Sequence, residues 1–145
     1  MRVIRRIRLT AMHICKKINH MKTTIYTQHQ EHTVWLNKLS FYADDIAVMQ
    51  RRIEEIAKKN TAKEVQMQIE HFQNQLLIQK NDIDAIKQDI KKDEKLLKDN
   101  ILKNETAVDH RKVEDHSKER EDVKSFEDNF NKLRKELNHF AAQWM

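Results

Sequence analysis

The 145-residue sequence contains no glycine and no proline, and it has a single cysteine, Cys15. Average usage would supply roughly ten glycines and roughly seven prolines in a chain of this length. Without glycine, the phosphate-binding loop, the dinucleotide-binding turn and the nucleophile elbow cannot form as their motifs are written. One cysteine allows no internal disulfide and no cysteine-rich zinc site. We therefore expect neither enzymatic activity nor a bound cofactor.

Charged residues are abundant, at 35% of the chain, but the positive charge is concentrated at one end. The formal net charge is +5. Residues 1–20 contain six basic residues and no acidic one, which leaves 22 basic and 23 acidic residues in the rest of the chain. A nucleic-acid-binding domain normally spreads lysine and arginine over one face of its folded body. The even balance after residue 20 therefore argues against a nucleic-acid partner.

Residues 1–20 allow two interpretations. Their apolar residues recur at helical spacing between arginines, as in a membrane-surface helix or an organellar targeting peptide, at Val3, Ile7, Ala11, Ile14 and Ile18. Alternatively, residues 1–20 do not belong to the natural protein, and Met21 is the true start. We favour the second interpretation. If the protein contacts a membrane at all, we expect it to do so only through residues 1–20.

The chain has no uninterrupted apolar run of the kind that crosses a membrane or begins a secretory signal. Arg5, Arg6 and Arg8 break the only N-terminal apolar stretch. A membrane span needs about 18 consecutive apolar residues. We therefore predict a soluble, cytoplasmic protein.

From about residue 30 onward, apolar residues recur at alternating steps of three and four, which is the heptad spacing of packed helices. The first such seam comprises Trp35, Leu39, Tyr42, Ile46, Met49, Ile53 and Ile56. The second comprises Val65, Ile69, Phe72, Leu76, Ile83, Ile86, Ile90 and Leu97, with polar Gln79 and Asp93 at the two skipped positions. The third comprises Val123, Phe126, Phe130, Leu133, Leu137, Phe140 and Trp144. The pattern predicts helices over about 30–60, 62–103 and 105–144.

A helix end and a helix start lie back to back near residue 60. Lys58 and Lys59 favour a helix C-terminus, and Asn60 tolerates the left-handed capping conformation. Thr61 and Glu64 then have the spacing of a capping box. The second boundary is less clearly marked, because no glycine decides it. We predict an all-α fold, an elongated antiparallel three-helix bundle or coiled coil over 30–145 with a basic N-terminal extension over 1–29.

The predicted turns set the register of the helices and place polar residues from all three in one layer. Positions in the first and second helices should meet when their numbers add to about 122, and those in the second and third when they add to about 208. His32, Asp93 (or Asp89), His116 and Arg120 then fall at about the same level. Two imidazoles and a carboxylate, His32, His116 and Asp93, would suit Zn²⁺ or Fe²⁺. We favour the plainer interpretation, a polar layer that fixes register.

These features predict a non-enzymatic coiled-coil interaction or scaffolding protein. Two alternatives stay open: a metal-binding bundle that uses the His32, Asp93 and His116 layer, and a membrane-surface protein anchored by residues 1–20. Beyond its main seam, the second helix carries surplus apolar residues, namely Leu77, Ile78, Leu96 and Leu102. A surplus apolar strip favours self-association, and symmetric dimers are its commonest form. We therefore expect a protein partner or self-association, as a homodimer.

Overall fold

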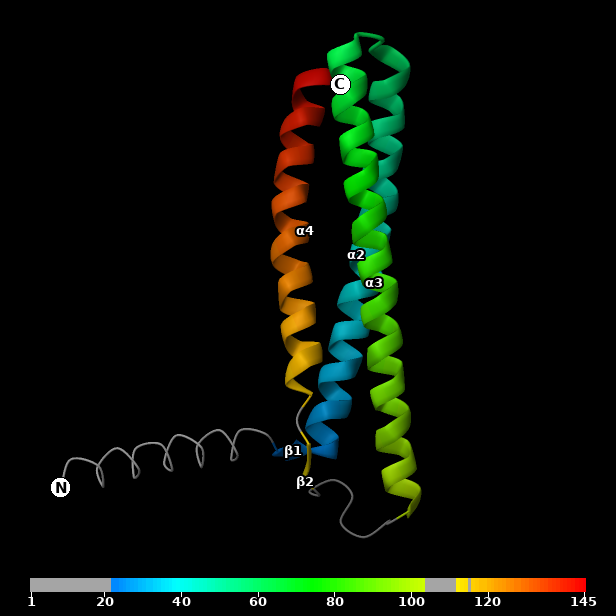
Figure 1. Cartoon of the computed structure of the whole chain (residues 1–145), viewed down its shortest axis with the longest axis vertical. Helices are drawn as coiled ribbons and strands as arrows, with labels where there is room; N and C mark the ends of the chain where they lie inside the picture. Colours follow the sequence, from blue (N-terminus) through cyan, green and yellow to red (C-terminus); the bar gives the residue numbers. More distant parts are fainter. Residues whose placement is uncertain (1–21, 104–111, 115) are drawn as a thin grey trace, which may run out of the picture.

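Three long helices pack side by side along almost their whole length (Figure 1). The computed structural model describes residues 22–103, 112–114 and 116–145. The elements, in chain order, are β1 (Lys22–Thr24), α2 (Ile25–Lys59), α3 (Lys63–Lys103), β2 (Lys112–Glu114) and α4 (Ser117–Trp144). Helices α2 and α4 run in one direction and α3 runs in the other (Figure 1). The predicted all-α three-helix bundle is therefore confirmed.

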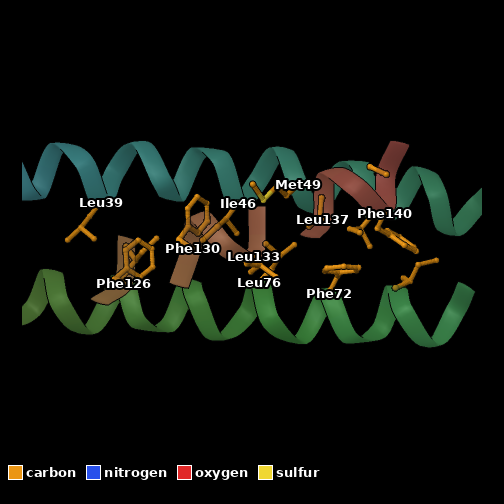
Figure 2. Close-up of a cluster of buried hydrophobic side chains, with 14 of the residues drawn as sticks. Leu39, Ile46, Met49, Phe72, Leu76, Phe126, Phe130, Leu133, Leu137 and Phe140 are labelled. Carbon is orange, nitrogen blue, oxygen red and sulfur yellow. The ribbon is translucent and has the colours of Figure 1, made fainter. Parts of the chain in front are cut away.

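The core of the bundle is built from the three predicted seams. Leu39 of α2, Leu76 of α3 and Phe130 of α4 are fully buried, and side chains of this kind fill the space between the helices (Figure 2). Aromatic rings also contact one another between helices. The centroid of the Tyr42 ring (α2) lies 4.9 Å from that of Phe130 (α4), and the centroid of the Phe72 ring (α3) lies 5.1 Å from that of Phe140 (α4). Burying each large apolar side chain contributes about 1.5–3 kcal/mol, so the seams account for the packing of the helices.

The turn between α2 and α3 is as short as predicted, but its capping differs. Asn60 has φ −126° and ψ 109°, an extended conformation rather than the left-handed one expected. Its side-chain Nδ2 donates to the carbonyls of Ile56 (2.9 Å) and Trp144 (3.1 Å). Asn60 therefore caps α2 locally, through its backbone N–H and its side chain, and also ties the turn to the end of α4. Helix α3 begins at Lys63, one residue later than the capping box predicts.

The two remaining helix starts also differ from the prediction. Helix α2 begins at Ile25, five residues before the predicted start, because the Thr24 hydroxyl caps it by accepting from the Thr27 backbone N–H at 3.1 Å. Helix α4 begins at Ser117 and not near 105. Residues 112–114 instead pair with β1 in an antiparallel ladder, in which Thr23 lies opposite Val113. Their backbone groups are bonded across the ladder, which excludes a helix there.

Residues 1–21 of the predicted extension over 1–29 lie outside the described residues, as does the stretch 105–111 of the predicted third helix. Among the helices that the structure describes, none combines the length and the apolar character needed to cross a bilayer.

Candidate functional site

Two buried imidazoles lie against each other near the β1–β2 end of the bundle. The ring centroids of His32 (α2) and His116, which immediately precedes α4, are 4.6 Å apart, and only 1% and 6% of these residues is exposed. The Trp35 ring completes the cluster, with its centroid 5.9 Å from that of His32 and 4.9 Å from that of His116. The sequence correctly predicts that these two histidines meet. Together with the polar partners Glu31, Glu94 and Arg120, they are called the histidine layer below.

The carboxylate of Glu94, on α3, accepts hydrogen bonds from two histidines of α2. His32 Nδ1 lies 2.6 Å from Glu94 Oε2, and His29 Nδ1 bonds the other oxygen. A carboxylate can only accept, so each imidazole presents its N–H. Partial burial would raise the pKa of Glu94, but the bonds from His32 and His29 outweigh it and hold the pKa below its ordinary value. Glu94 is therefore an ionised bridge between α2 and α3.

Glu31 makes the equivalent bridge between α2 and the start of α4. Its Oε2 accepts from His116 Nε2 at 2.6 Å, and Arg120 Nη2 lies 3.0 Å and 3.2 Å from its two oxygens. Burial again works to raise the pKa of Glu31, while the bonds from His116 and Arg120 lower it further than burial raises it. Each buried histidine thus has its own carboxylate, and the two pairs connect all three helices.

The predicted third ligand, Asp93, is not the carboxylate that contacts either histidine. Its side chain instead bonds Glu119 of α4, and burial together with this neighbour raises the pKa of the Glu119 carboxyl. The reason is register. His32 meets Glu94, about one helical turn beyond the Ile90 that the sequence places opposite it. Phe72 likewise meets Phe140, where the predicted register would place Glu136.

The described side chains of the histidine layer are not grouped around one point as metal ligands would be. Within the residues that the structure describes, no group of three or more histidine, cysteine, aspartate or glutamate side chains is placed to hold a metal ion. Both imidazoles already use one nitrogen to bond a carboxylate. His32 Nε2 is buried and has no hydrogen-bond partner among the described residues. What the arrangement does chemically is to hold three helices in one register through hydrogen bonds between imidazoles and carboxylates.

A second feature, which sequence analysis missed, is an exposed apolar line on the outside of α2. Val34, Phe41 and Val48 are spaced by seven residues and are 52%, 60% and 39% exposed. Because heptad positions repeat along one side of a packed helix, the three side chains form a single line. This line is called the α2 outer face below. The signal that could have revealed it is the seven-residue spacing of apolar residues away from the seam.

The surplus residues predicted on the second helix are exposed but scattered. Each is at least 49% exposed: Leu77, Ile78, Leu96 and Leu102. Ile78 and Leu96 share one side of α3 but are separated by about 27 Å along the helix, and Leu77 and Leu102 by about 37 Å. The four residues therefore make no continuous strip. The homodimer that they were expected to support remains a prediction.

The groove between α3 and α4 is polar. It contains two cavities of about 270 and 390 Å³ that share Asp82 and Asn129 in their walls. Most of the other lining side chains are also polar, including Asp89, Asp122 and Glu136. An apolar helix would gain little from entering this groove, so the α2 outer face is the better candidate for a contact surface.

No family model, no curated protein and no solved structure matches this chain. The functional interpretation therefore depends on the histidine layer and the α2 outer face.

Proposed function

We propose that the protein is a non-enzymatic interaction module that binds a partner helix through the α2 outer face. The observation that carries this proposal is the exposure of Phe41, a large aromatic side chain that is 60% exposed on α2. Single exposed apolar residues are normal on protein surfaces. Three of them in one line, with an aromatic residue at the centre, have the pattern of an interaction anchor.

The spacing of the α2 outer face suits a helical partner. Apolar residues at seven-residue intervals present a straight ridge, about 21 Å long between Val34 and Val48 at 1.5 Å per residue. Such a ridge fits into the groove of another helix, as in other helix-recognition surfaces. The partner would contact side chains and not the backbone of α2, because the backbone groups of α2 are already hydrogen-bonded within the helix.

In this proposal the histidine layer has a structural role. It bonds α2 to both of its neighbours near the end of the bundle opposite the turn. A face that must meet a partner in one geometry benefits from a scaffold that is held in one register. The metal-binding alternative has no comparable support, because Asp93 pairs with Glu119 and not with the histidines.

Photo-crosslinking tests the proposal even while the partner is unidentified. A photoreactive phenylalanine analogue replaces Phe41 in the cells that make the protein, and the same analogue replaces Leu77 as the control. Leu77 is matched to Phe41 in exposure, at 53%, but lies on α3 away from the α2 outer face. We expect one discrete protein adduct from position 41 and none of that mass from position 77. Equal crosslinking at both positions, or none at position 41, would overturn the proposal.

A further inference from the structure

We propose that the partner of the α2 outer face is a second copy of this chain, packed antiparallel across a two-fold axis that passes near Phe41. The inference rests on the proposed function, since it names the occupant of the same face. Two observations carry it: the apolar line is symmetric about its centre, and the charges along one edge are complementary to themselves.

The apolar line is symmetric about Phe41. Val34 precedes it by seven residues and Val48 follows it by seven. A two-fold axis perpendicular to α2 at this point therefore places Val34 of one copy opposite Val48 of the other. The same axis places the two Phe41 rings against each other, and aromatic pairs of this kind contribute beyond their buried area. The three exposed side chains are thus covered at once by a single, closed, isologous contact.

The charges beside the line alternate with the same period. The edge that faces α4 carries, at seven-residue intervals, Glu31, Lys38, Asp45 and Arg52. When two such edges meet antiparallel about Phe41, Lys38 of one copy lies near Asp45 of the other. Glu31 then lies near Arg52 at each end. Every charge meets its opposite, which favours this orientation over others.

The antiparallel orientation follows from the geometry of the two-fold axis. An axis perpendicular to the helices brings the α4-side edge of one copy against the same edge of the other. An axis parallel to the helices would instead bring this edge against the opposite edge of α2, where Asn37 and Asp44 occupy the corresponding positions. The alternating edge is matched to itself only in the antiparallel pair.

The edge charges are already oriented by contacts within the chain. Lys38 Nζ lies 3.1 Å from Glu127, Asp45 bonds Arg134, and Glu31 bonds Arg120. They nevertheless remain accessible, since the side chains of Lys38, Glu31 and Asp45 are 48%, 32% and 29% exposed. Partly exposed pairs contribute little energy by themselves. Their role in the dimer is to set orientation, while the apolar line supplies the attraction.

Cysteine crosslinking tests the arrangement on the full chain. Cys15 is first changed to Ser, and Val34→Cys and Val48→Cys variants are made separately, which leaves Phe41 in place. Positions 34 and 48 of one helix are about 21 Å apart, whereas a disulfide needs Cα atoms within about 7 Å. We expect a covalent dimer when the two variants are mixed, and none when either is oxidised alone. Leu77→Cys, in the same background, is the control and should remain uncrosslinked.

The mass in solution provides the second measurement. Sedimentation equilibrium of the unmodified chain should give twice the 17.5 kDa of one chain, and Phe41→Glu should return it to a single chain with an unchanged helical circular dichroism spectrum. Leu77→Glu, the matched control, should leave the dimer intact.

The outcomes separate this inference from the proposed function. Crosslinking of either single variant alone, or a single-chain mass for the unmodified protein, would overturn the antiparallel dimer. If position 41 still gave a photo-adduct with a different protein, the proposed function would stand and only the dimer would be wrong. If position 41 gave no photo-adduct at all, both would be wrong.

Discussion

The imidazole of His32 lies 4.6 Å from the imidazole of His116, centroid to centroid, although the two residues are far apart in the sequence. Each ring bonds a different carboxylate, Glu94 on α3 or Glu31 on α2. The pair therefore fixes the level of α4 relative to both other helices. These contacts hold α2, and with it the α2 outer face, in a fixed position relative to α3 and α4.

Packing of the predicted seams should dominate the stability of the bundle. Leu39 is completely buried, whereas Leu77 is 53% exposed. Changing Leu39 to Ala should lower the free energy of unfolding by about 2–5 kcal/mol, because it removes buried contacts and leaves a cavity. The same change at Leu77 should cost less than about 1 kcal/mol. Urea denaturation of both variants measures the difference, and equal losses would refute the assignment of the core.

The carboxylates of the histidine layer should make the free energy of unfolding depend on pH in the acidic range. Because the pKa values of Glu31 and Glu94 are lowered below 4.5 in the folded chain, their contribution is present above that pH and is lost as the pH falls through the lowered values. A Glu31→Gln, Glu94→Gln double variant should be less stable than the parent at pH 5 by about 1–3 kcal/mol.

Below pH 4.5 the two curves should converge, since the parent carboxylates then become protonated. Denaturation midpoints between pH 5 and pH 3 follow this convergence, with Glu54→Gln, an exposed glutamate of α2, as the control that should stay parallel to the parent. A difference that stays constant over this range would show that the histidine layer is not ionised as described.

The contact between Asp93 and Glu119 should be unfavourable at neutral pH. Burial and the neighbouring Asp93 raise the pKa of Glu119 in the folded chain. The folded state therefore holds the Glu119 proton more tightly, and this contribution to stability is lost as the pH rises from 4.5 through the raised value. Asp93→Asn should thus stabilise the protein by up to about 1 kcal/mol at pH 7.

The gain should disappear below pH 4.5, where Glu119 is protonated in both the folded and the unfolded chain. The control is Asp84→Asn, at an exposed position of the same helix, which should change stability by less than about 0.5 kcal/mol. A loss of stability in Asp93→Asn at pH 7 would contradict this account of the pair.

The metal hypothesis has a direct thermal test. Since no described group of three ligands surrounds the histidines, addition of Zn²⁺ or Fe²⁺ should leave the melting temperature of the parent unchanged. Each of the variants His32→Ala and His116→Ala should have a lower melting temperature than the parent, and the size of this decrease should be the same with and without metal. A rise of several degrees on adding metal, absent in both variants, would restore the metal site predicted from the sequence.

The seams could be predicted because heptad spacing is a local property of the sequence. Trp35, Ile53 and Phe130 are buried as their spacing requires. The meeting of His32 and His116 was also predictable, because both are polar residues on seams that the two turns bring to one level. The first residues of the helices were harder to predict from the sequence. The β1–β2 ladder pairs residues 22–24 with 112–114, and segments this short have too few residues to show a periodic pattern.

The partners of the histidines could not be predicted from the sequence, because they depend on register to within one turn. A shift of four residues replaces Ile90 by Glu94 opposite His32 and leaves Asp93 against Glu119. Helical spacing fixes which side of a helix is buried, but it leaves the sliding of one helix along another undetermined. Tertiary contacts, such as Asn60 with Trp144 and Phe72 with Phe140, settle that position.

Side-chain footprinting in intact cells tests the central claim, that the α2 outer face is covered by a partner, most directly. Hydroxyl radicals modify accessible side chains, and Phe41 and Leu77 are 60% and 53% exposed in the single chain. The modification of each residue is normalised to that of the same residue in unfolded protein. We predict that the normalised modification of Phe41 in cells is several-fold lower than that of Leu77. Equal modification of the two residues would contradict the claim.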